Sequence, residues 1–299
     1  MAPHSVAFAT PLPQSTRSEI LEWRFPKPYH NYVLTGRSRA AWHTSFVIPH
    51  LDLLLDAGLF VNKLRPKHIF LTHGHSDHTL VGPAFGKTDD PPDVYCPAEM
   101  ADAFINFCSA RTLLNNGGLM THTTHGLVAG AVVPLRRLKN ITAEAFACDH
   151  TVPCLGYVFS QTTQKLKPEY TSLSGAELKA LRETQGVAIT AAVTTPIFAF
   201  LGDTTTATLA ARPAWLAAGI PVVITECSFL YEEHRVQAVK TKHTIWGDLE
   251  VVVRQWPRTM FVLTHFSMRY SGDEIKDFFK QLVDPPVNIL VWADGQGGG

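Results

Sequence analysis

The sequence predicts an α/β protein with enough strands for two sheets. Apolar runs of strand length recur along the whole chain, helical patterns fall between them, and 45% of the residues are apolar. A chain of 299 residues with this content can bury a sizeable core, as one large domain or as two small ones. No low-complexity linker interrupts the chain, so we expect one domain over residues 1–299.

The expected strands are short runs rich in β-branched and aromatic residues, bounded by Gly, Pro or polar residues. The segment SFVIPHLDLLLDAG (45–58) predicts two strands joined by a turn. Further strands are expected at HIFLTH (68–73), DVYCP (93–97), ITAEAFACDH (141–150), LGYVFS (155–160), IFAFLGD (197–203), PVVITECS (221–228), MFVLTHFS (260–267) and VNILVWAD (287–294).

Helices are expected where Pro or a Ser-Gly pair precedes acidic first-turn residues. These segments are PAEMADAFINFCSA (97–110), SGAELKALRET (174–184) and SGDEIKDFFKQL (271–282). KTDDPPD (87–93) and LNNGGLMTH (114–122) are expected loops, and the C-terminal GQGGG (295–299) is expected to fray. Residues 1–18 lack acidic groups, which is compatible with an organelle transit peptide, although we favour a disordered tail.

Composition narrows the classes of function. Lys+Arg and Asp+Glu both number 26, so the whole molecule offers no strong field for a polyanion, and an acidic partner must be bound by local patches. The five cysteines are odd in number and form no C-x-x-C pair, which favours a reducing compartment and argues against cysteine-bound zinc. No apolar stretch approaches the roughly 20 residues that cross a bilayer, so we expect no membrane association.

The segment FLTHGHSDHT (70–79) crowds titratable residues directly after an apolar run. They are His73, His75, Asp77 and His78. In extended chain the first three share one face, whereas His78 points the other way or begins a helix. A polar turn with hydrogen-bonded histidines is the alternative, but three histidines and an aspartate at this spacing favour a metal site.

Three other apolar runs end in the same way, at His150, Asp203 and His265. Strand ends of an α/β sheet gather along one edge, so we expect these side chains to join the first cluster. Imidazole nitrogen and carboxylate oxygen are zinc ligands, and a catalytic zinc takes about three of them from the protein. Seven candidate ligands are too many for one ion and suit two.

These residues resemble the metallo-β-lactamase superfamily and, within it, tRNase Z (RNase Z), the tRNA 3′-processing endonucleases. H-x-H-x-D-H indicates the superfamily. The resemblance to tRNase Z, mostly to its short plant-type members, rests on DHTVPCLGYVFS (149–160), KLKPEYTSLSGAELKALRETQGVAIT (165–190), ITECSFL (224–230), KHT (242–244) and LTHFSMRY (263–270). It implies an αββα sandwich, two mixed sheets flanked by helices, with metals at one edge.

The resemblance also implies roles for single residues. His73, His75 and His150 would bind one zinc, Asp77, His78 and His265 the other, and Asp203 would bridge two Zn²⁺, with Mn²⁺ or another divalent ion as an alternative. Asp77 is also expected to take part in catalysis. Glu226 would orient His243 and raise its pKa, so that His243 donates a proton to the departing ribose oxygen.

The implied activity is zinc-dependent endonucleolytic removal of the 3′ trailer from precursor tRNA, leaving a tRNA 3′-hydroxyl. The family precedent is a homodimer, and we expect a cytoplasmic or nuclear location, or an organelle if the N-terminal tail is a transit peptide. One alternative is a dinuclear hydrolase of a small phosphodiester, ester or thioester. Another is a non-catalytic RNA-binding subunit, against which the complete set of seven ligands argues.

Two departures from the family pattern concern substrate binding. Bacterial members carry a long Gly/Pro-rich arm that grips the tRNA elbow, whereas 52 residues (151–202) separate the third and fourth motifs here. Without that arm, we expect the grip to come from elsewhere, with two basic clusters as candidates that could equally be solvated faces. These are Arg136, Arg137 and Lys139, and Lys165 and Lys167. The family's loop that senses the tRNA 3′ end has its nearest match at Arg37 and Arg39, which we leave outside the site.

Overall fold

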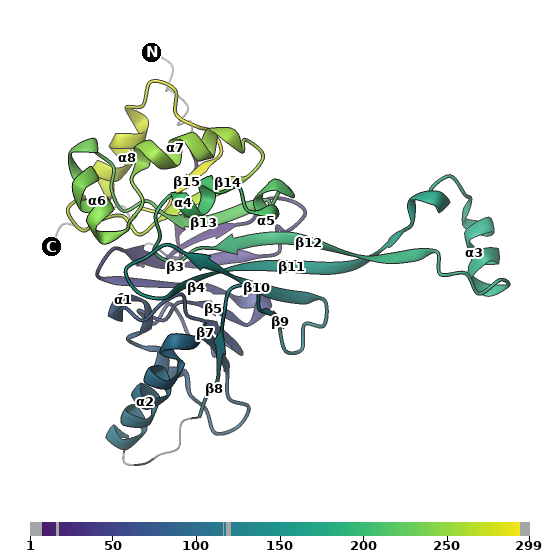
Figure 1. Cartoon of the computed structure of the whole chain (residues 1–299), viewed down its shortest axis with the longest axis horizontal. Coiled ribbons are helices and arrows are strands. Elements are labelled where there is room, and N and C mark those ends of the chain that lie inside the picture. The colour runs from purple at the N-terminus through teal and green to yellow at the C-terminus, as the bar shows by residue number, and fades with distance from the viewer. Residues whose placement is uncertain (1–7, 16–17, 116, 118–120, 294–299) are drawn as a thin grey trace.

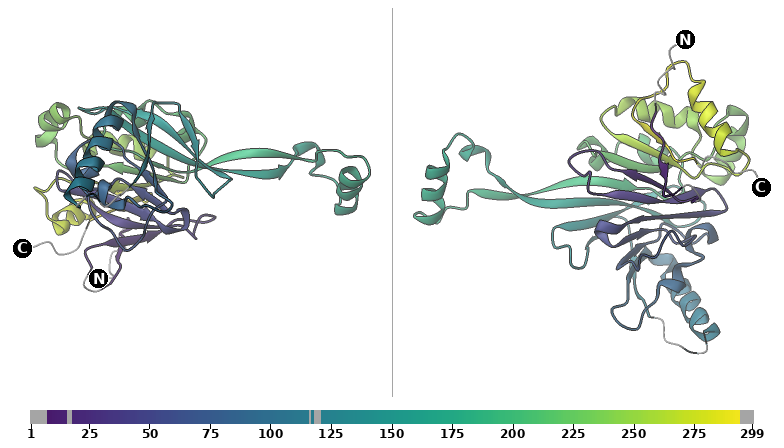
Figure 2. Two further views of the ribbon diagram at one scale, coloured as in Figure 1. Left: turned by 90° about the horizontal axis from the view of Figure 1, so that it is seen from below. Right: turned by 180° about the vertical axis from the view of Figure 1, so that it is seen from behind.

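The structure is a computed structural model that describes residues 8–15, 18–115, 117 and 121–293. Two sheets pack face to face with helices on their outer sides, which is the αββα sandwich expected from the sequence (Figures 1 and 2). A narrow arm leaves the sandwich at the end opposite to α6 and α8 (Figure 1).

The first sheet has eight strands in sequence order. It is antiparallel from β1 to β5 and parallel from β5 to β8. The strands are β1 (Leu12–Pro13), β2 (Leu21–Arg24), β3 (Val33–Arg39), β4 (His43–Ile48), β5 (Leu53–Leu55), β6 (His68–Phe70), β7 (Asp93–Pro97) and β8 (Thr123–Leu127).

The second sheet has seven strands and is likewise mixed. It is antiparallel from β9 to β12 and parallel from β12 to β15. The strands are β9 (Val132–Pro134), β10 (Ile141–Cys148), β11 (Cys154–Leu166), β12 (Thr190–Phe200), β13 (Val222–Glu226), β14 (Met260–Thr264) and β15 (Ile289–Val291).

The helices are α1 (Ser76–Thr79), α2 (Ala98–Leu114), α3 (Gly175–Glu183), α4 (Ala207–Ala210), α5 (Ala214–Ala217), α6 (Arg235–Thr241), α7 (Trp246–Gln255) and α8 (Gly272–Lys280). The three helices predicted from the sequence are α2, α3 and α8. The last two begin with capping boxes, in which Ser174 and Ser271 exchange hydrogen bonds with the glutamate three residues on.

Aromatic side chains from the inner faces of both sheets form the central core. Phe46 of the first sheet meets Trp292 with ring centroids 5.1 Å apart, and Phe70 meets Tyr157 of the second sheet at 4.9 Å. Separate apolar clusters lie under α7 and α8 on one side and under α2 on the other. This packing holds the strand ends that carry the candidate ligands in fixed relative positions.

The arm corrects the expectation that the segment between the third and fourth motifs is too short to form one. β11 and β12 pair from Tyr157 and Phe200 outward to Leu166 and Thr190, and α3 lies at the tip (Figure 1). The sequence predicted only the apolar halves of these strands, 155–160 and 197–203. Their outer halves are threonine-rich and solvated on both faces, so they show none of the alternation by which a half-buried strand is recognised.

The N-terminal segment also differs from the tail expected over residues 1–18. Phe8 is buried against Phe279, with ring centroids 5.9 Å apart, and Ala9 forms a parallel bridge with Leu290. These contacts, together with the pairing of β1 with β2, join residues 8–13 to the body of the protein. Residues 1–7 and 16–17, part of the expected loop 114–122, and the expected frayed end 295–299 lie outside the described residues. Across the described ranges, no helix is long and apolar enough to cross a membrane.

Candidate metal centre

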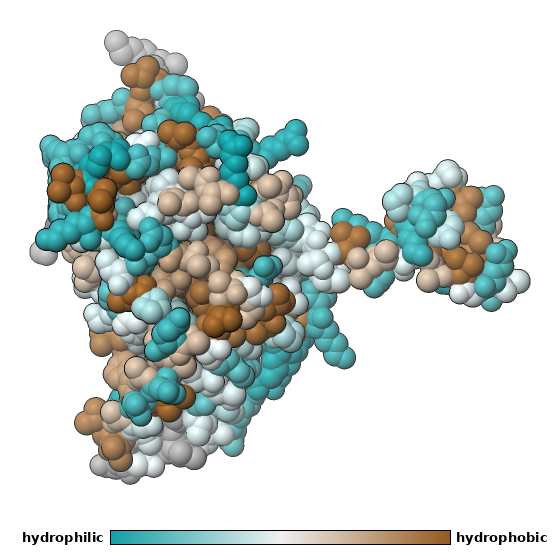
Figure 3. All heavy atoms as spheres, viewed as in Figure 1, coloured by the Kyte–Doolittle hydropathy of each residue, from teal (hydrophilic) through white to brown (hydrophobic). Residues whose placement is uncertain are grey.

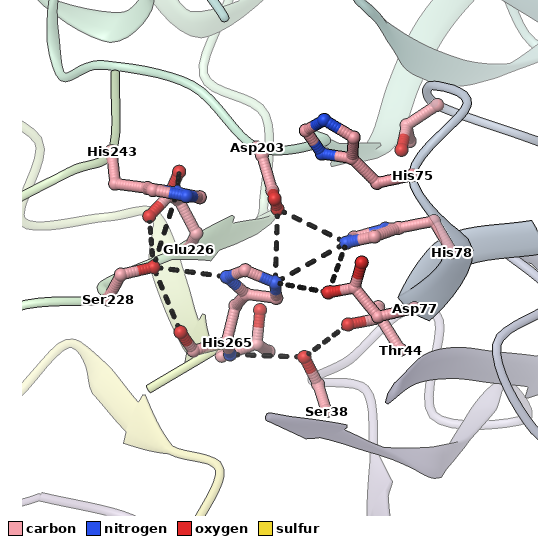
Figure 4. A network of polar contacts seen from close by, with 12 residues as sticks. Ser38, Thr44, His75, Asp77, His78, Asp203, Glu226, Ser228, His243 and His265 are labelled. Atoms are coloured by element: carbon pink, nitrogen blue, oxygen red, sulfur yellow. Dashed lines mark hydrogen bonds and ion pairs between the residues drawn. The ribbon is translucent and has the colours of Figure 1, made fainter. Parts of the chain in front are cut away.

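The candidate ligands gather at one edge of the sandwich, where β6, β10, β12 and β14 end. His73 follows β6, His150 follows β10, Asp203 follows β12 and His265 follows β14. The remaining three candidates, His75, Asp77 and His78, lie at the start of α1, which turns the chain back over this edge (Figure 4). The sequence prediction that four strand ends converge is therefore confirmed.

The ligand atoms form two groups, in each of which all atoms lie within 4.8 Å of one another. The first group contains His73, His75, His150 and Asp203, and the second contains Asp77, His78 and His265. Asp203, His243 and His265 form a third, overlapping group. The first two groups coincide with the ligand sets that the family resemblance implies.

Asp203 lies between the two groups and turns one carboxylate oxygen to each. Its Oδ2 is 3.6 Å from Nε2 of His73, whereas its Oδ1 is 3.4 Å from Nε2 of both His78 and His265 (Figure 4). Within the first group, Nδ1 of His75 faces Nε2 of His73 at 3.0 Å and Nε2 of His150 at 3.3 Å. Several nitrogens turned toward one point is the arrangement that a bound cation requires.

The opposite ring nitrogens of four histidines have partners of their own. Nδ1 of His73 lies 3.0 Å from Oγ1 of Thr72, and Nδ1 of His78 lies 2.7 Å from Oδ2 of Asp56. Nδ1 of His150 lies 3.2 Å from the carbonyl oxygen of Lys242, and Nδ1 of His265 lies 3.0 Å from Oγ of Ser228. Such outer partners fix the tautomer and orientation of metal-binding imidazoles. The residues present therefore fit a pair of divalent transition-metal ions.

Asp56 is an important residue that the sequence reasoning missed. It is fully buried after β5, and its carboxylate accepts hydrogen bonds from His78 and from the backbone N–H of Thr72, the latter at 2.7 Å. Burial raises the pKa of Asp56, and these hydrogen bonds only partly offset the effect. The signal was available, because LLLDAG (53–58) is another apolar run ending in Asp.

The local electrostatics at Asp203 and His73 suit cation binding. Burial alone would raise the pKa of Asp203, but His265, His78 and His73 outweigh burial and hold its pKa well below the usual value. Burial, together with the neighbouring imidazoles, lowers the pKa of His73 well below its usual value. A charged carboxylate and a neutral imidazole are the protonation states that metal ligands need.

Glu226 and His243 lie beside the candidate ligands as a hydrogen-bonded pair. Nδ1 of His243 is 2.9 Å from Oε1 of Glu226, which is buried at the end of β13 (Figure 4). Glu226 also accepts hydrogen bonds from the backbone N–H groups of Thr204 and Thr244 and from the hydroxyl of Ser228. Burial alone would lower the pKa of His243, but the charge and hydrogen bond of Glu226 raise it to about 9.

A cleft of about 410 Å³ opens over this centre. Besides candidate ligands and His243, Lys240 and Ala41 line it. Lys242, which directly precedes His243, adopts a left-handed backbone conformation (φ 53°). Its ammonium forms an ion pair with Asp149 at 2.8 Å, and its carbonyl oxygen lies 3.2 Å from Nδ1 of His150. Neither lysine was expected at the site, although Lys242 is the first residue of the KHT motif and Lys240 lies two residues before it.

The other basic residues weighed from the sequence lie away from the cleft or face inward. Arg136 and Arg137 form ion pairs with Asp90 at 2.7 and 2.9 Å, so the structure favours a structural role for them. Lys165 and Lys167 lie on the arm, and Arg37 and Arg39 are buried beneath the loop that follows β3.

An αββα sandwich with such a cluster at one edge defines the class of metallo-β-lactamase-fold hydrolases. Solved structures agree on the fold. The short form of human tRNase Z superposes with a TM-score of 0.53 at 17% identity, covering 78% of this chain and 92% of that one. The metallo-β-lactamase-fold protein YhfI from Bacillus subtilis gives a TM-score of 0.51 at 11% identity, covering 98% and 97%.

Sequence comparison narrows the class to one family. The chain is 29% identical to tRNase Z TRZ1 of Arabidopsis thaliana over 273 residues, covering 89% of this chain and 96% of the relative. It is 30% identical to the nuclear ribonuclease Z of Triticum aestivum over 169 residues, covering 54% and 94%. No protein-family model matches the chain. The chain belongs to the tRNase Z (ribonuclease Z) family.

Proposed function

We propose that this protein is an endoribonuclease that cleaves the 3′ trailer from precursor tRNA by hydrolysis of a phosphodiester bond. The products would be a tRNA ending in a 3′-hydroxyl and a trailer beginning with a 5′-phosphate. Membership of the tRNase Z family supports the substrate class. The observation that carries the proposal is the Glu226–His243 pair beside two groups of metal-binding side chains.

The proposed cofactor is a pair of zinc ions, and Mn²⁺ or another divalent ion suits the same ligands. His73, His75 and His150 would hold one ion, Asp77, His78 and His265 the other, and the two oxygens of Asp203 would serve both. Two such ions supply Lewis acidity and positive charge for hydrolysis of a phosphodiester. Nitrogen and carboxylate donors without thiolates favour zinc over softer ions.

His243 would donate the proton that the departing ribose oxygen needs. With its pKa raised to about 9, it carries that proton at neutral pH. Glu226 holds Nδ1, which leaves Nε2 as the donating atom. Because Glu226 also receives hydrogen bonds from Thr204, Ser228 and Thr244, its carboxylate cannot turn away from His243 without breaking several contacts.

The arm is the proposed grip on the body of the tRNA. Lys165 and Lys167 lie near its outer end, and neither forms an ion pair with any residue in the described part of the chain. No residue of α3 is buried, so the tip does not contribute to the core. Figure 3 shows the arm standing clear of the body with hydrophilic and hydrophobic side chains mixed at its tip.

A second copy of the chain is the proposed partner. α2 buries only Phe104 and exposes Ile105, Phe107, Leu113 and Leu114 to solvent. A helix with so many exposed apolar side chains is typical of an interface. A homodimer through this helix predicts that Phe107→Glu yields monomers in light scattering while α2 remains folded. The proposed location is the cytoplasm or nucleus, or an organelle.

The alternatives make a different demand on the Glu226–His243 pair. A hydrolase of small esters or thioesters with good leaving groups does not need a proton donor, whereas an alkoxide leaving from ribose does. A non-catalytic RNA-binding subunit needs neither the donor nor the complete ligand set. A hydrolase of esters or thioesters and a non-catalytic subunit therefore leave the buried Glu226 without a role, whereas a hydrolase of a small phosphodiester would use it and is separated by the choice of substrate.

The test is incubation of the purified protein with a 3′-extended precursor tRNA, followed by sequencing and end-group analysis of the fragments. We expect one cut at the 3′ end of the tRNA, with a 3′-hydroxyl on its upstream side. A 2′,3′-cyclic phosphate would instead indicate attack by the ribose hydroxyl, and no cut with intact hydrolysis of small esters would favour the first alternative. The His243→Ala variant serves as the control for contaminating nucleases.

A further inference from the structure

The turn between β3 and β4 carries one tryptophan directly after a residue that lines the metal cleft. The turn runs from Arg39 to His43, and Trp42 donates its backbone N–H to the Arg39 carbonyl at 3.2 Å. Ala41, directly before Trp42, has a φ of 58° and lines the cleft together with Asp77 and His265. Trp42 is thus one residue removed from the wall of the site.

This turn is fastened to the segment that carries His265. Arg39 donates to the Phe266 carbonyl at 3.2 Å and the Ser267 carbonyl at 3.0 Å, and it also donates to the Tyr270 carbonyl. The Ala40 N–H donates to the Phe266 carbonyl at 3.1 Å. Because these bonds join the turn to the chain just after a candidate ligand, Trp42 is held in a fixed position relative to the metal centre.

The indole of Trp42 is exposed to solvent, although Arg37 and His43 contact it. It is 51% exposed, whereas the other five tryptophans are buried or half-buried. The Arg37 guanidinium lies over the ring at 4.7 Å from its centroid and is itself paired with Glu19, and the His43 ring lies 4.4 Å away. Arg37 and Arg39 therefore support the turn, and the group that the turn presents to solvent is Trp42.

We propose that Trp42 is a stacking platform for a nucleobase next to the phosphodiester that is cut. Every base has a face that an indole can cover, and such stacking orders single-stranded RNA without reading its sequence. The inference rests on the proposed function, since it requires RNA in the cleft. It assigns the β3–β4 turn a direct part in positioning the substrate.

A cation in the cleft favours RNA over an apolar protein surface as the occupant. Lys240 lines the same cleft as Ala41, and its ammonium has no carboxylate partner among the described residues. A platform for a base and an unpaired cation for a phosphate suit the two parts of one nucleotide. A protein partner would leave this cation unmatched at the edge of an apolar contact.

Binding can be followed without cleavage through the intrinsic fluorescence of tryptophan. Mature-length tRNA, which has only the bases upstream of the cut, is added to the metal-loaded wild-type protein. Precursor tRNA, which also has the bases downstream of the cut, is added to the His243→Ala protein, in which cleavage should be slow. Stacking of a base on an exposed indole quenches its emission. We expect quenching with at least one RNA in proteins that carry Trp42, and its loss when Trp42→Phe is added.

The matched control is Trp215→Phe. Trp215 lies on α5 and packs against Phe146. This variant should keep the quenching and the rate. Trp42→Ala should lower kcat/KM on precursor tRNA by about 5- to 100-fold, mainly through KM, and Trp42→Phe by less, because phenylalanine still stacks.

Three results would overturn the proposal. The first is equal quenching in proteins with and without Trp42, and the second is unchanged kcat/KM in Trp42→Ala. The third is a change of oligomeric state in Trp42→Ala by light scattering, which would place Trp42 in a protein interface. Failure of the proposed function is distinguishable, because the wild-type protein would then not cut precursor tRNA at all.

Discussion

The metal edge and the arm lie at opposite ends of β11 and β12 and have opposite character. At the inner ends of β11 and β12, buried side chains and polar contacts surround Asp203 and His150. At the outer ends, the strands carry threonines and lysines in water, and α3 buries nothing. Under the proposed roles, the chemistry and the binding of the substrate are separated in the fold, because only the metal edge depends on the packed core.

The largest expected effect comes from removing the carboxylate between the two ligand groups. Asp203→Ala should lower occupancy at both metal sites and reduce cleavage by far more than the ~10- to 100-fold typical of lost outer partners. Metal per protein by elemental analysis and the cleavage rate are the measurements. Asp89→Ala, an exposed aspartate, is the control. Full occupancy and rate in Asp203→Ala would contradict the bridging role.

Replacing the proton donor should separate acid catalysis from metal binding. His243→Ala should keep both metals while kcat on precursor tRNA falls by about 10²- to 10⁴-fold, and Glu226→Ala should cost somewhat less. A nitrophenyl phosphodiester has a leaving group that needs little protonation, so its hydrolysis should be less sensitive. His30→Ala, an exposed histidine, is the control. Equal losses on both substrates would mean that the pair positions the substrate or supports the fold.

Asp56 sharpens the comparison, since it acts from within the core. Asp56→Asn removes the negative charge that faces Nδ1 of His78, so metal affinity should fall by about 10- to 100-fold. Competition with a chelator measures this affinity. Asp52→Asn, in the exposed turn before β5, should leave it unchanged. Unchanged affinity in Asp56→Asn would show that the hydrogen bond is not needed to orient His78.

The arm should respond in the opposite way. Replacing Lys165 and Lys167 together with alanine should raise KM for precursor tRNA by about tenfold and flatten its salt dependence by roughly one to two units of slope. Metal content and melting temperature should not change, because neither lysine lies in the core. Lys63→Ala, an exposed lysine on the body, is the control. A loss of metal in the double variant would contradict the separation, because it would show that the arm supports the metal centre.

The smallest expected effect is a shift in pH dependence. Because the pKa of His243 is raised to about 9, the donating form is present below that pH and is lost as the pH rises through it. Glu226→Gln removes the charge that raises the pKa, so the alkaline limb of kcat should move about 1–3 units toward lower pH. A pH–rate profile on precursor tRNA measures it. An unmoved limb would assign the alkaline pKa to another group.

The same contrast explains what the sequence could predict. His73, His150, Asp203 and His265 each follow an apolar strand. β12 and β14 lie in the parallel half of the second sheet, and β10 runs in the same direction as β12 because both pair antiparallel with β11, so their ends meet at one edge, which the end of β6 joins from the first sheet. The outer halves of β11 and β12 have no buried face and therefore no pattern. α7 was not predicted for a different reason. Val251, Val252 and Val253 are β-branched and favour a strand by propensity, although the helix has a buried face.

Partners within the site were harder to predict than the ligands. Asp56 and Lys242 come from segments distant in the chain, and only the folded structure shows which ring nitrogen each one meets. Trp42 carried no signal, because an aromatic residue beside a strand usually packs in the core.

The number of metal ions per chain tests the central claim most directly. The claim is that seven side chains at one sheet edge hold two divalent ions for hydrolysis of a phosphodiester in RNA. Protein purified without chelator and assayed for cleavage of precursor tRNA should contain about two transition-metal ions per chain by elemental analysis, mostly zinc. A ratio near zero with cleavage intact would contradict the account.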